Sequence, residues 1–220
     1  MSSDRRLQEA VLDELRWEPR LEAGHVGVTA ADGVVMLTGH VEDYAQKHAA
    51  ELAARRVKGV RAVAQELVVR LPVDEQRDDD DIAAAALTRL DWDVTIPRRS
   101  IQVTVEDGWI TLSGEVDWHY QREQVEHDLQ KLPGVTGMTN AIAIRKTVDP
   151  QFVCDDIVHA LHRSWFFDPK TIDVRVKDGA VHLTGTVRTP HERQVAAATA
   201  WAAPGVVDVR NELEVAGTVG

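Results

Sequence analysis

The sequence repeats one pattern three times, and this repetition constrains the fold more than any other feature. Each copy contains an Asp-Gly pair, then an alternating apolar stretch interrupted by a second glycine, and later a Gly-Val pair. The glycines of the Asp-Gly pairs are Gly33, Gly108 and Gly179, which lie 75 and 71 residues apart, and the later glycines keep both spacings. Such self-similarity indicates a tandem array of one structural unit. The chain of 220 residues is therefore expected to hold three small units.

Each unit is expected to begin with an amphipathic helix and to continue into a β-hairpin. Apolar residues recur at spacings of three or four before the first strand, which is typical of a helix. Asp-Gly is the strongest short hairpin signal, because both central residues of the favoured turn take positive φ. The flanking strands alternate apolar and polar residues, so one face of the sheet is expected to meet water. The apolar helix positions are Leu7, Val11 and Leu15; Ile82, Ala86 and Leu90; and Val153, Ile157 and Leu161.

The rest of each unit is expected to contain a second helix and a closing strand. A glycine interrupts the second strand at Gly39, Gly114 and Gly185, where we expect a bulge or a close backbone approach. The second helix ends at a further glycine, as helices often do. The predicted fold class is α+β, with three tandem α-β-β-α-β two-layer sandwiches. Each has about 65 residues, near the size at which a single core is only marginally stable.

The predicted units span residues 1–73, 82–147 and 148–217, with an acidic linker at 74–81. The linker reads DEQRDDDD and carries six acids against one Arg, which is nearly half of the net charge of −11. Such a run favours a solvated spacer whose last Asp caps a helix starting at Ile82. A weak divalent-cation site or an acidic patch for a partner is the alternative, although no glycine-bearing calcium loop follows.

The repeated pattern resembles the BON domain. The resemblance rests on the DG turn, the V-x-L-x-G-x-V strand, the P-G-V turn and a closing N-x-L-x-V strand. The closing motif stands as NAIAI at 140–144 and NELEV at 211–215, while the first unit has Gln65 in place of Asn. The resemblance covers nearly the whole chain. It implies a non-enzymatic bacterial module of osmotic stress that binds phospholipid surfaces or partner proteins. A cytoplasmic cation or osmotic sensor is the alternative, because one cytoplasmic relative senses potassium, as is a self-associating structural protein.

Composition and motifs argue against several other functions. The net charge of −11 argues against a nucleic-acid binder, which needs a basic face. The single Cys154 excludes an intrachain disulfide, and His159 and His162 lack a third ligand for a metal site. No Walker loop, GxSxG or HExxH motif occurs. We therefore expect no catalytic residue, metal, cofactor or small-molecule substrate. We expect a cytoplasmic location because no signal peptide or apolar span is visible, and a periplasmic one if a leader is missing.

Residues that differ between units are the candidates for function, because the shared glycines and apolar positions serve as scaffold. Large aromatics at positions that are smaller or polar in the other units predict packing between repeats or protomers, or contact with an external ligand. Self-association as a homo-oligomer would use the same side chains. The candidate surface contacts are Trp109, Trp118 and Trp201, with the basic pairs Arg55 and Arg56, and Arg98 and Arg99.

A second set of tryptophans is shared by the units. Trp17, Trp92 and Trp165 stand at the end of each first helix. Their equivalence predicts a structural role, with each ring packed in the core or at the junction between helix and loop.

Overall fold

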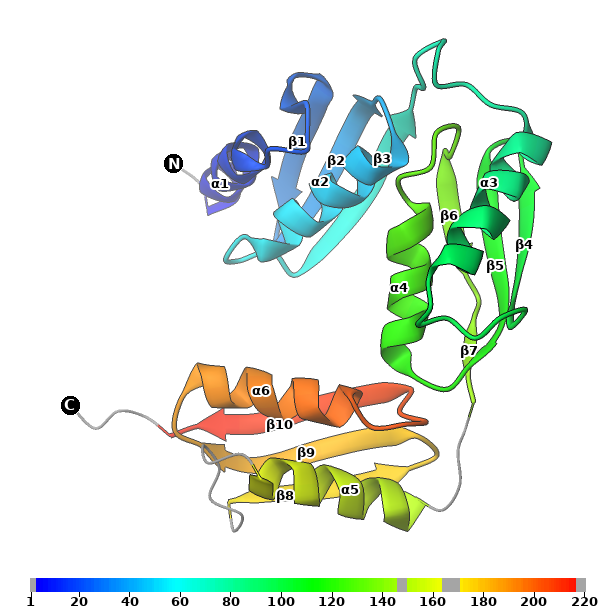
Figure 1. Cartoon of the computed structure of the whole chain (residues 1–220). Coiled ribbons are helices and arrows are strands. Elements are labelled where there is room, and N and C mark those ends of the chain that lie inside the picture. The colour runs from blue at the N-terminus through cyan, green and yellow to red at the C-terminus, as the bar shows by residue number, and fades with distance from the viewer. Residues whose placement is uncertain (1–2, 146–149, 164–170, 217–220) are drawn as a thin grey trace. The chain divides into compact units, whose positions relative to one another are not determined.

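A computed structural model describes residues 3–145, 150–163 and 171–216. In these residues the same α-β-β-α-β unit occurs three times, so the predicted fold class is confirmed (Figure 1). Each repeat carries its own sheet. The repeated sequence pattern therefore corresponds to one structural unit that occurs three times.

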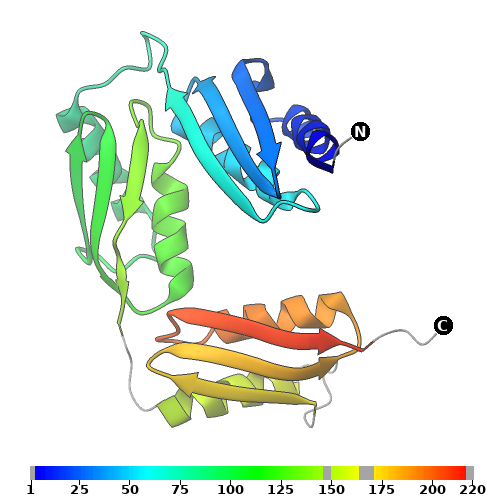
Figure 2. The ribbon, with the colours of Figure 1, turned by 180° about the vertical axis from the view of Figure 1, so that it is seen from behind.

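The first repeat contains a sheet of strand order β1-β2-β3 with two helices on one face (Figures 1 and 2). Strands β1 and β2 pair antiparallel, and β2 and β3 pair parallel. The core lies between the helices and the sheet, and includes Val11, Leu37 and Ala50. The elements are α1 (Ser3–Trp17), the 3-10 turn η1 (Ala23–His25), β1 (Val26–Ala31), β2 (Val34–Val41), α2 (Tyr44–Arg56) and β3 (Ala62–Val69).

The second repeat keeps this order, but its closing strand is divided into two short segments. Strand β5 lies between β4 and β6, and β7 pairs parallel with β5. The division falls after Asn140, whose side-chain oxygen accepts a hydrogen bond from the amide of Ile142 at 3.2 Å. The elements are α3 (Asp79–Trp92), β4 (Ile101–Glu106), β5 (Trp109–Val116), α4 (His119–Leu129), β6 (Gly137–Asn140) and β7 (Ala143–Ile144).

The third repeat has the strand order β10-β9-β8. Strands β8 and β9 pair antiparallel, and β9 and β10 pair parallel, as in the first repeat. Asn211 of the closing motif donates to the carbonyl of Arg193 in the second helix at 2.8 Å, so this Asn ties the last strand to the helix above it. The elements are α5 (Pro150–Arg163), β8 (Ile172–Lys177), β9 (Ala180–Val187), α6 (Pro190–Trp201) and β10 (Asp208–Val215).

The Asp-Gly pairs form the predicted hairpin turns. Asp32 has a φ of 49° and Gly33 a φ of 81°, and the pairs at 107–108 and 178–179 have closely similar values. Positive φ at both central residues defines the type I′ turn, which matches the twist of the flanking strands. The structural role expected for these residues is therefore confirmed.

The glycine within each second strand marks a close approach of two backbone segments, as expected. A Cβ on Gly114 would overlap the carbonyl oxygen of Ser100, and the equivalent overlaps are Gly39 with His25 and Gly185 with Thr171. These glycines also have φ values from 110° to 126°. Any side chain here would force the loop away from the second strand.

The first helix of the second repeat begins earlier in the acidic segment than the sequence predicts. Helix α3 begins at Asp79 and not at Ile82, so the expected cap by Asp81 is wrong. The reason is a contact made by Asp79, whose carboxylate accepts the amides of Asp107 and Gly108, each at 2.9 Å. The start of the helix is thereby joined to the hairpin turn, and Asp79 belongs to the folded unit.

Candidate interaction surface

The tryptophans at the ends of α1 and α3 are exposed, which contradicts the predicted packing role. Trp17 is 86% exposed and Trp92 is 80% exposed. The buried stripe of each helix ends two residues earlier, at Leu15 and Leu90. Two residues correspond to about 200° around a helix of 3.6 residues per turn, so each ring points away from the core. Trp165 lies outside the described residues.

The loop that follows Trp92 adds further exposed groups. Val94 is 96% exposed, and Arg98 and Arg99 are exposed as well. Ile96 is buried and holds the middle of this loop to the protein. An indole, an isopropyl group and two guanidinium groups thus reach solvent within eight residues of sequence. This composition is typical of segments that meet a partly apolar and partly anionic surface.

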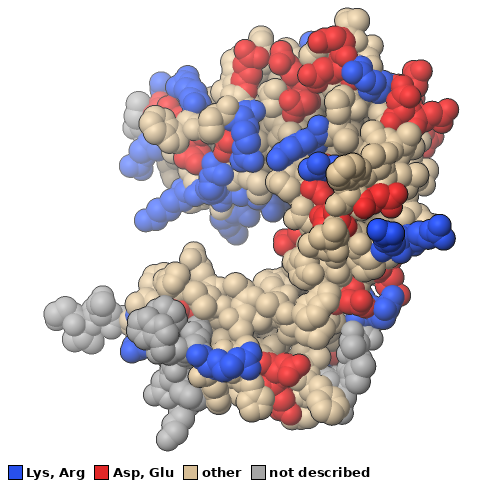
Figure 3. Space-filling view, viewed as in Figure 1, with Lys and Arg blue, Asp and Glu red and all other residues tan. Residues whose placement is uncertain are grey.

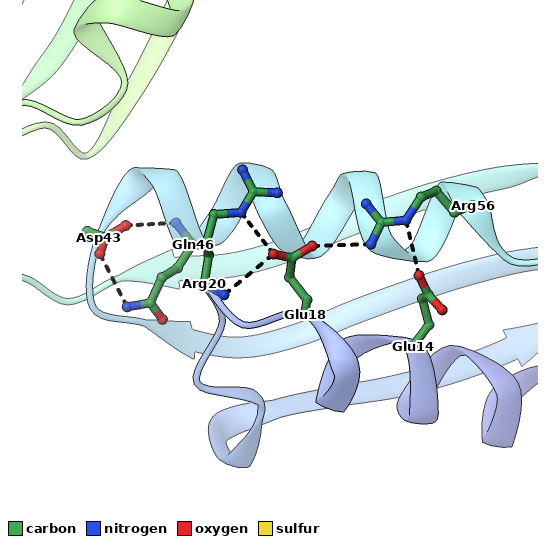
Figure 4. Close-up of polar contacts among 6 residues, drawn as sticks. All are labelled: Glu14, Glu18, Arg20, Asp43, Gln46 and Arg56. Carbon is green, nitrogen blue, oxygen red and sulfur yellow. Dashed lines mark hydrogen bonds and ion pairs between the residues drawn. The ribbon is translucent and has the colours of Figure 1, made fainter.

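In the first repeat the candidate arginines Arg55 and Arg56 form ion pairs within the protein. The Glu18 carboxylate is buried and accepts from Arg20 Nε at 2.8 Å and from Arg56 Nη2 at 3.1 Å (Figure 4). Arg56 Nε also donates to Glu14 at 3.0 Å, and Arg55 pairs with Glu51. Both candidate arginines are therefore neutralised by neighbouring acids, and this part of the surface offers a binding partner little free positive charge.

These contacts make the stability of the first repeat depend on pH. Hydrogen bonds from Arg20 and Arg56 lower the pKa of Glu18 from 4.5 to about 2. A lowered pKa in the folded state stabilises the fold above pH 4.5, and this contribution disappears as the pH falls toward 2. Glu18→Gln should therefore lower the free energy of unfolding by about 1–2 kcal/mol at pH 7. The difference from wild type should vanish near pH 2.

Urea unfolding of the two chains from pH 7 to pH 2 measures this difference. Glu14→Gln serves as the control, because it removes a more exposed carboxylate of the same cluster. A stability difference between wild type and Glu18→Gln that stayed constant over this range would contradict the assignment.

The three unshared tryptophans are held more firmly than the shared ones. Trp109 is 44% exposed, donates from Nε1 to Thr139 Oγ1 at 3.0 Å, and covers Gly137, where a Cβ would overlap the ring. Trp118 is half-buried and lies against Tyr120, with ring centroids 6.3 Å apart. Trp201 is half-buried against the core of the third repeat and stacks on His119, with centroids 3.9 Å apart. All three therefore contribute to packing.

The side chains considered for metal binding and nucleophilic chemistry have the following surroundings within the described residues. In the part of the chain that the structure describes, no three His, Cys, Asp or Glu side chains gather as metal ligands would. Cys154 Sγ donates to the carbonyl of Val174 at 3.3 Å, and burial together with Asp155 and Asp173 raises the pKa of this thiol. A thiol in this state is a poor nucleophile near neutral pH.

No described helix combines the length and apolar composition that crossing a bilayer requires.

Comparison with known proteins assigns the family. The model of the BON domain matches residues 3–70, 78–146 and 153–217. Osmotically-inducible protein Y of Escherichia coli (strain K12) is 30% identical over 124 residues, which are 54% of this chain and 62% of that protein. The chain thus covers less than two thirds of this curated relative.

Solved structures of CdsD, a structural protein of the type III secretion system of Chlamydia trachomatis, also align with the chain. Its C-terminal domain aligns at 16% identity with a TM-score of 0.28, covering 96% of this chain and 98% of that one. A second CdsD structure aligns at 16% identity with a TM-score of 0.27, covering 96% and 92%. The family match spans most of the sequence, and this chain belongs to the BON domain family, with three copies of the domain in tandem.

Proposed function

We propose that this chain is a non-catalytic module that binds phospholipid surfaces through the tryptophans at the ends of its first helices. The observation that carries the proposal is the exposure of Trp17 and Trp92 at equivalent positions. Keeping a large aromatic ring in water forgoes about 2 kcal/mol of hydrophobic stabilisation. The tryptophan is exposed at the same position in two repeats, which favours a role in binding and not in stabilising the fold.

The chemistry of the site favours an interfacial, mainly apolar mode of binding. Indole rings partition to the boundary between lipid headgroups and acyl chains, because they combine an apolar body with one N–H donor. The chain carries a net charge of −11, and Arg55 and Arg56 are paired with acids. Long-range attraction to an anionic membrane would therefore contribute little. Similarity to an osmotically inducible protein extends the proposal to a role in osmotic stress.

Co-flotation of the purified chain with lipid vesicles tests this proposal. Neutral and anionic vesicles should both carry the chain upward, and binding should persist when salt rises from low to physiological concentration. Salt screens charge–charge attraction but leaves apolar burial largely unchanged. Absence of binding to either composition would contradict the proposal and would favour a protein partner for the same tryptophans.

A further inference from the structure

The first repeat contains a hollow that the lipid-binding proposal does not use. Its volume is about 700 Å³, and it lies where the start of α1, the β1–β2 turn and the α2–β3 turn meet. Three cationic side chains line it, one from α1 and two from the α2–β3 turn. They are Arg6, Lys58 and Arg61.

These cations form no direct ion pair within the described residues, and they outnumber the two acids of the hollow by three to two. Within residues 3–145, 150–163 and 171–216, none of Arg6, Lys58 and Arg61 forms an ion pair with a carboxylate. Asp4 and Asp32 also line the hollow, and Asp4 accepts the backbone amide of Asp32 at 3.2 Å. Lys and Arg side chains gather on the visible face of this repeat, although the chain as a whole is acidic (Figure 3).

Arg61 is positioned by the hairpin turn. Its amide donates to the carbonyl of Gly33 at 2.8 Å, and its aliphatic stem lies so close to Gly33 that a Cβ there would meet Arg61 Cδ at 2.9 Å. The stem thus lies along the turn at the wall of the hollow, although Arg61 as a whole is exposed. Contact with the turn restricts the stem on one side, which lowers the conformational entropy that the guanidinium loses when it binds an anion.

The other two repeats show that the fold itself does not need this charge. The position of Arg61 beside the turn glycine is taken by Thr136 in the second repeat and by Val207 in the third. Sequence spacing places Asp81 and Phe152 at the position of Arg6, and Pro133 and Pro204 at the position of Lys58. The basic lining is therefore specific to the first repeat, where a structural explanation is lacking.

We propose that this hollow binds a phosphate group. Arginine forms paired hydrogen bonds with phosphate oxygens, lysine adds a point charge, and the first amides of α1 supply the positive end of a helix dipole. The volume exceeds that of inorganic phosphate, and Asp4 and Asp32 can accept hydrogen bonds from hydroxyl or amine groups. The ligand class is thus a small phosphorylated molecule or a phosphate-bearing lipid headgroup.

This site is separate from the tryptophan surface. Trp17 closes α1, whereas the hollow is lined by residues between Ser3 and Ala10 of this helix, about 10 to 20 Å away along a helix with a rise of 1.5 Å per residue. A soluble phosphate therefore tests the hollow without any bilayer. A failure of vesicle binding would therefore not contradict phosphate binding in the hollow. A failure of phosphate binding would likewise not contradict vesicle binding through the tryptophans.

Titration of the intact chain with inorganic phosphate and with glycerol 3-phosphate, followed by amide NMR, tests the site at constant ionic strength. Saturable shifts are expected for residues 3–7, 32–33 and 58–61, with no such response to chloride. Arg61→Gln and Arg6→Gln should each weaken binding about tenfold. Arg16→Gln, on the same helix but outside the hollow, should bind like wild type.

A second arm separates the two sources of phosphate. Vesicles containing an anionic phospholipid should compete with glycerol 3-phosphate if the natural ligand is a headgroup, and should leave the titration unchanged if it is a free molecule. Unsaturable shifts, equal shifts with chloride, or an unaltered affinity in both arginine variants would overturn the proposal.

Discussion

Gly114→Ala is expected to remove most of the stability of the second repeat while the first and third repeats keep theirs. The new Cβ would overlap the carbonyl oxygen of Ser100, and the residue would have to keep a φ of 126°. Strain and steric conflict of this kind cost about 4 kcal/mol. A unit of about 65 residues has roughly 6 kcal/mol of stability at 0.1 kcal/mol per residue, so most of it would be lost.

Hydrogen exchange measured by mass spectrometry localises this loss. Peptides from β4 and β5 should exchange rapidly in the variant, whereas peptides from β1, β2, β8 and β9 should keep their protection. Gly24→Ala provides the matched control, because a Cβ at Gly24 would meet no atom within 4 Å. If Gly114→Ala exchanged like Gly24→Ala, the close approach of the two backbones would not be essential to the unit.

The double variant Trp17→Ala with Trp92→Ala is expected to lose nearly all vesicle binding. Burial of one large apolar side chain contributes about 2 kcal/mol, and about 1.4 kcal/mol changes an equilibrium constant tenfold. Each substitution should therefore lower the vesicle partition coefficient by roughly thirtyfold, and both together by nearly a thousandfold. Stability should change little, because both rings are exposed.

Vesicle titration followed by flotation measures the partition coefficient. Trp109→Phe is the control for total aromatic content, since Trp109 is held against Gly137 and Thr139 on the sheet. If Trp109→Phe lost binding and the double variant kept it, the sheet face would be the contact and the ends of the helices would not.

Much of the fold could be predicted because its signals are local and occur three times. The Asp-Gly turns depend on two adjacent residues, and the glycines of the second strands occur at matching positions. The start predicted for helix α3 was three residues too late. The contact that determines the true start joins Asp79 to Gly108, 29 residues away. Local chemistry determines the elements, whereas contacts of long sequence separation decide where an element begins.

The exposure of Trp17 and Trp92 contradicts the packing role that their shared position predicts. The helical period by itself predicts this exposure, because Trp17 follows the buried Leu15 by two residues and so lies on the opposite face of the helix. The ion pairs around Glu18 were not predictable in this way. Two of them join Arg56 to Glu14 and Glu18, which only the packing of α2 against α1 brings together.

The basic hollow could be predicted from the sequence only in part. Alignment of the repeats places Arg6, Asp81 and Phe152 at one position, so the unusual charge of the first repeat is visible in the sequence. Convergence of that charge on one site is not visible, because residues 6 and 61 meet only when the closing turn lies beside the start of α1.

The most direct measurement is the quenching of Trp17 and Trp92 fluorescence by lipids that carry bromine in their acyl chains. A chain in which Trp109, Trp118, Trp165 and Trp201 are replaced by Phe would report on these two rings alone. With neutral vesicles at physiological salt, we expect emission to shift to shorter wavelength and to be quenched strongly by bromine near the headgroups. Unshifted and unquenched emission would contradict the claim that these tryptophans enter the membrane surface.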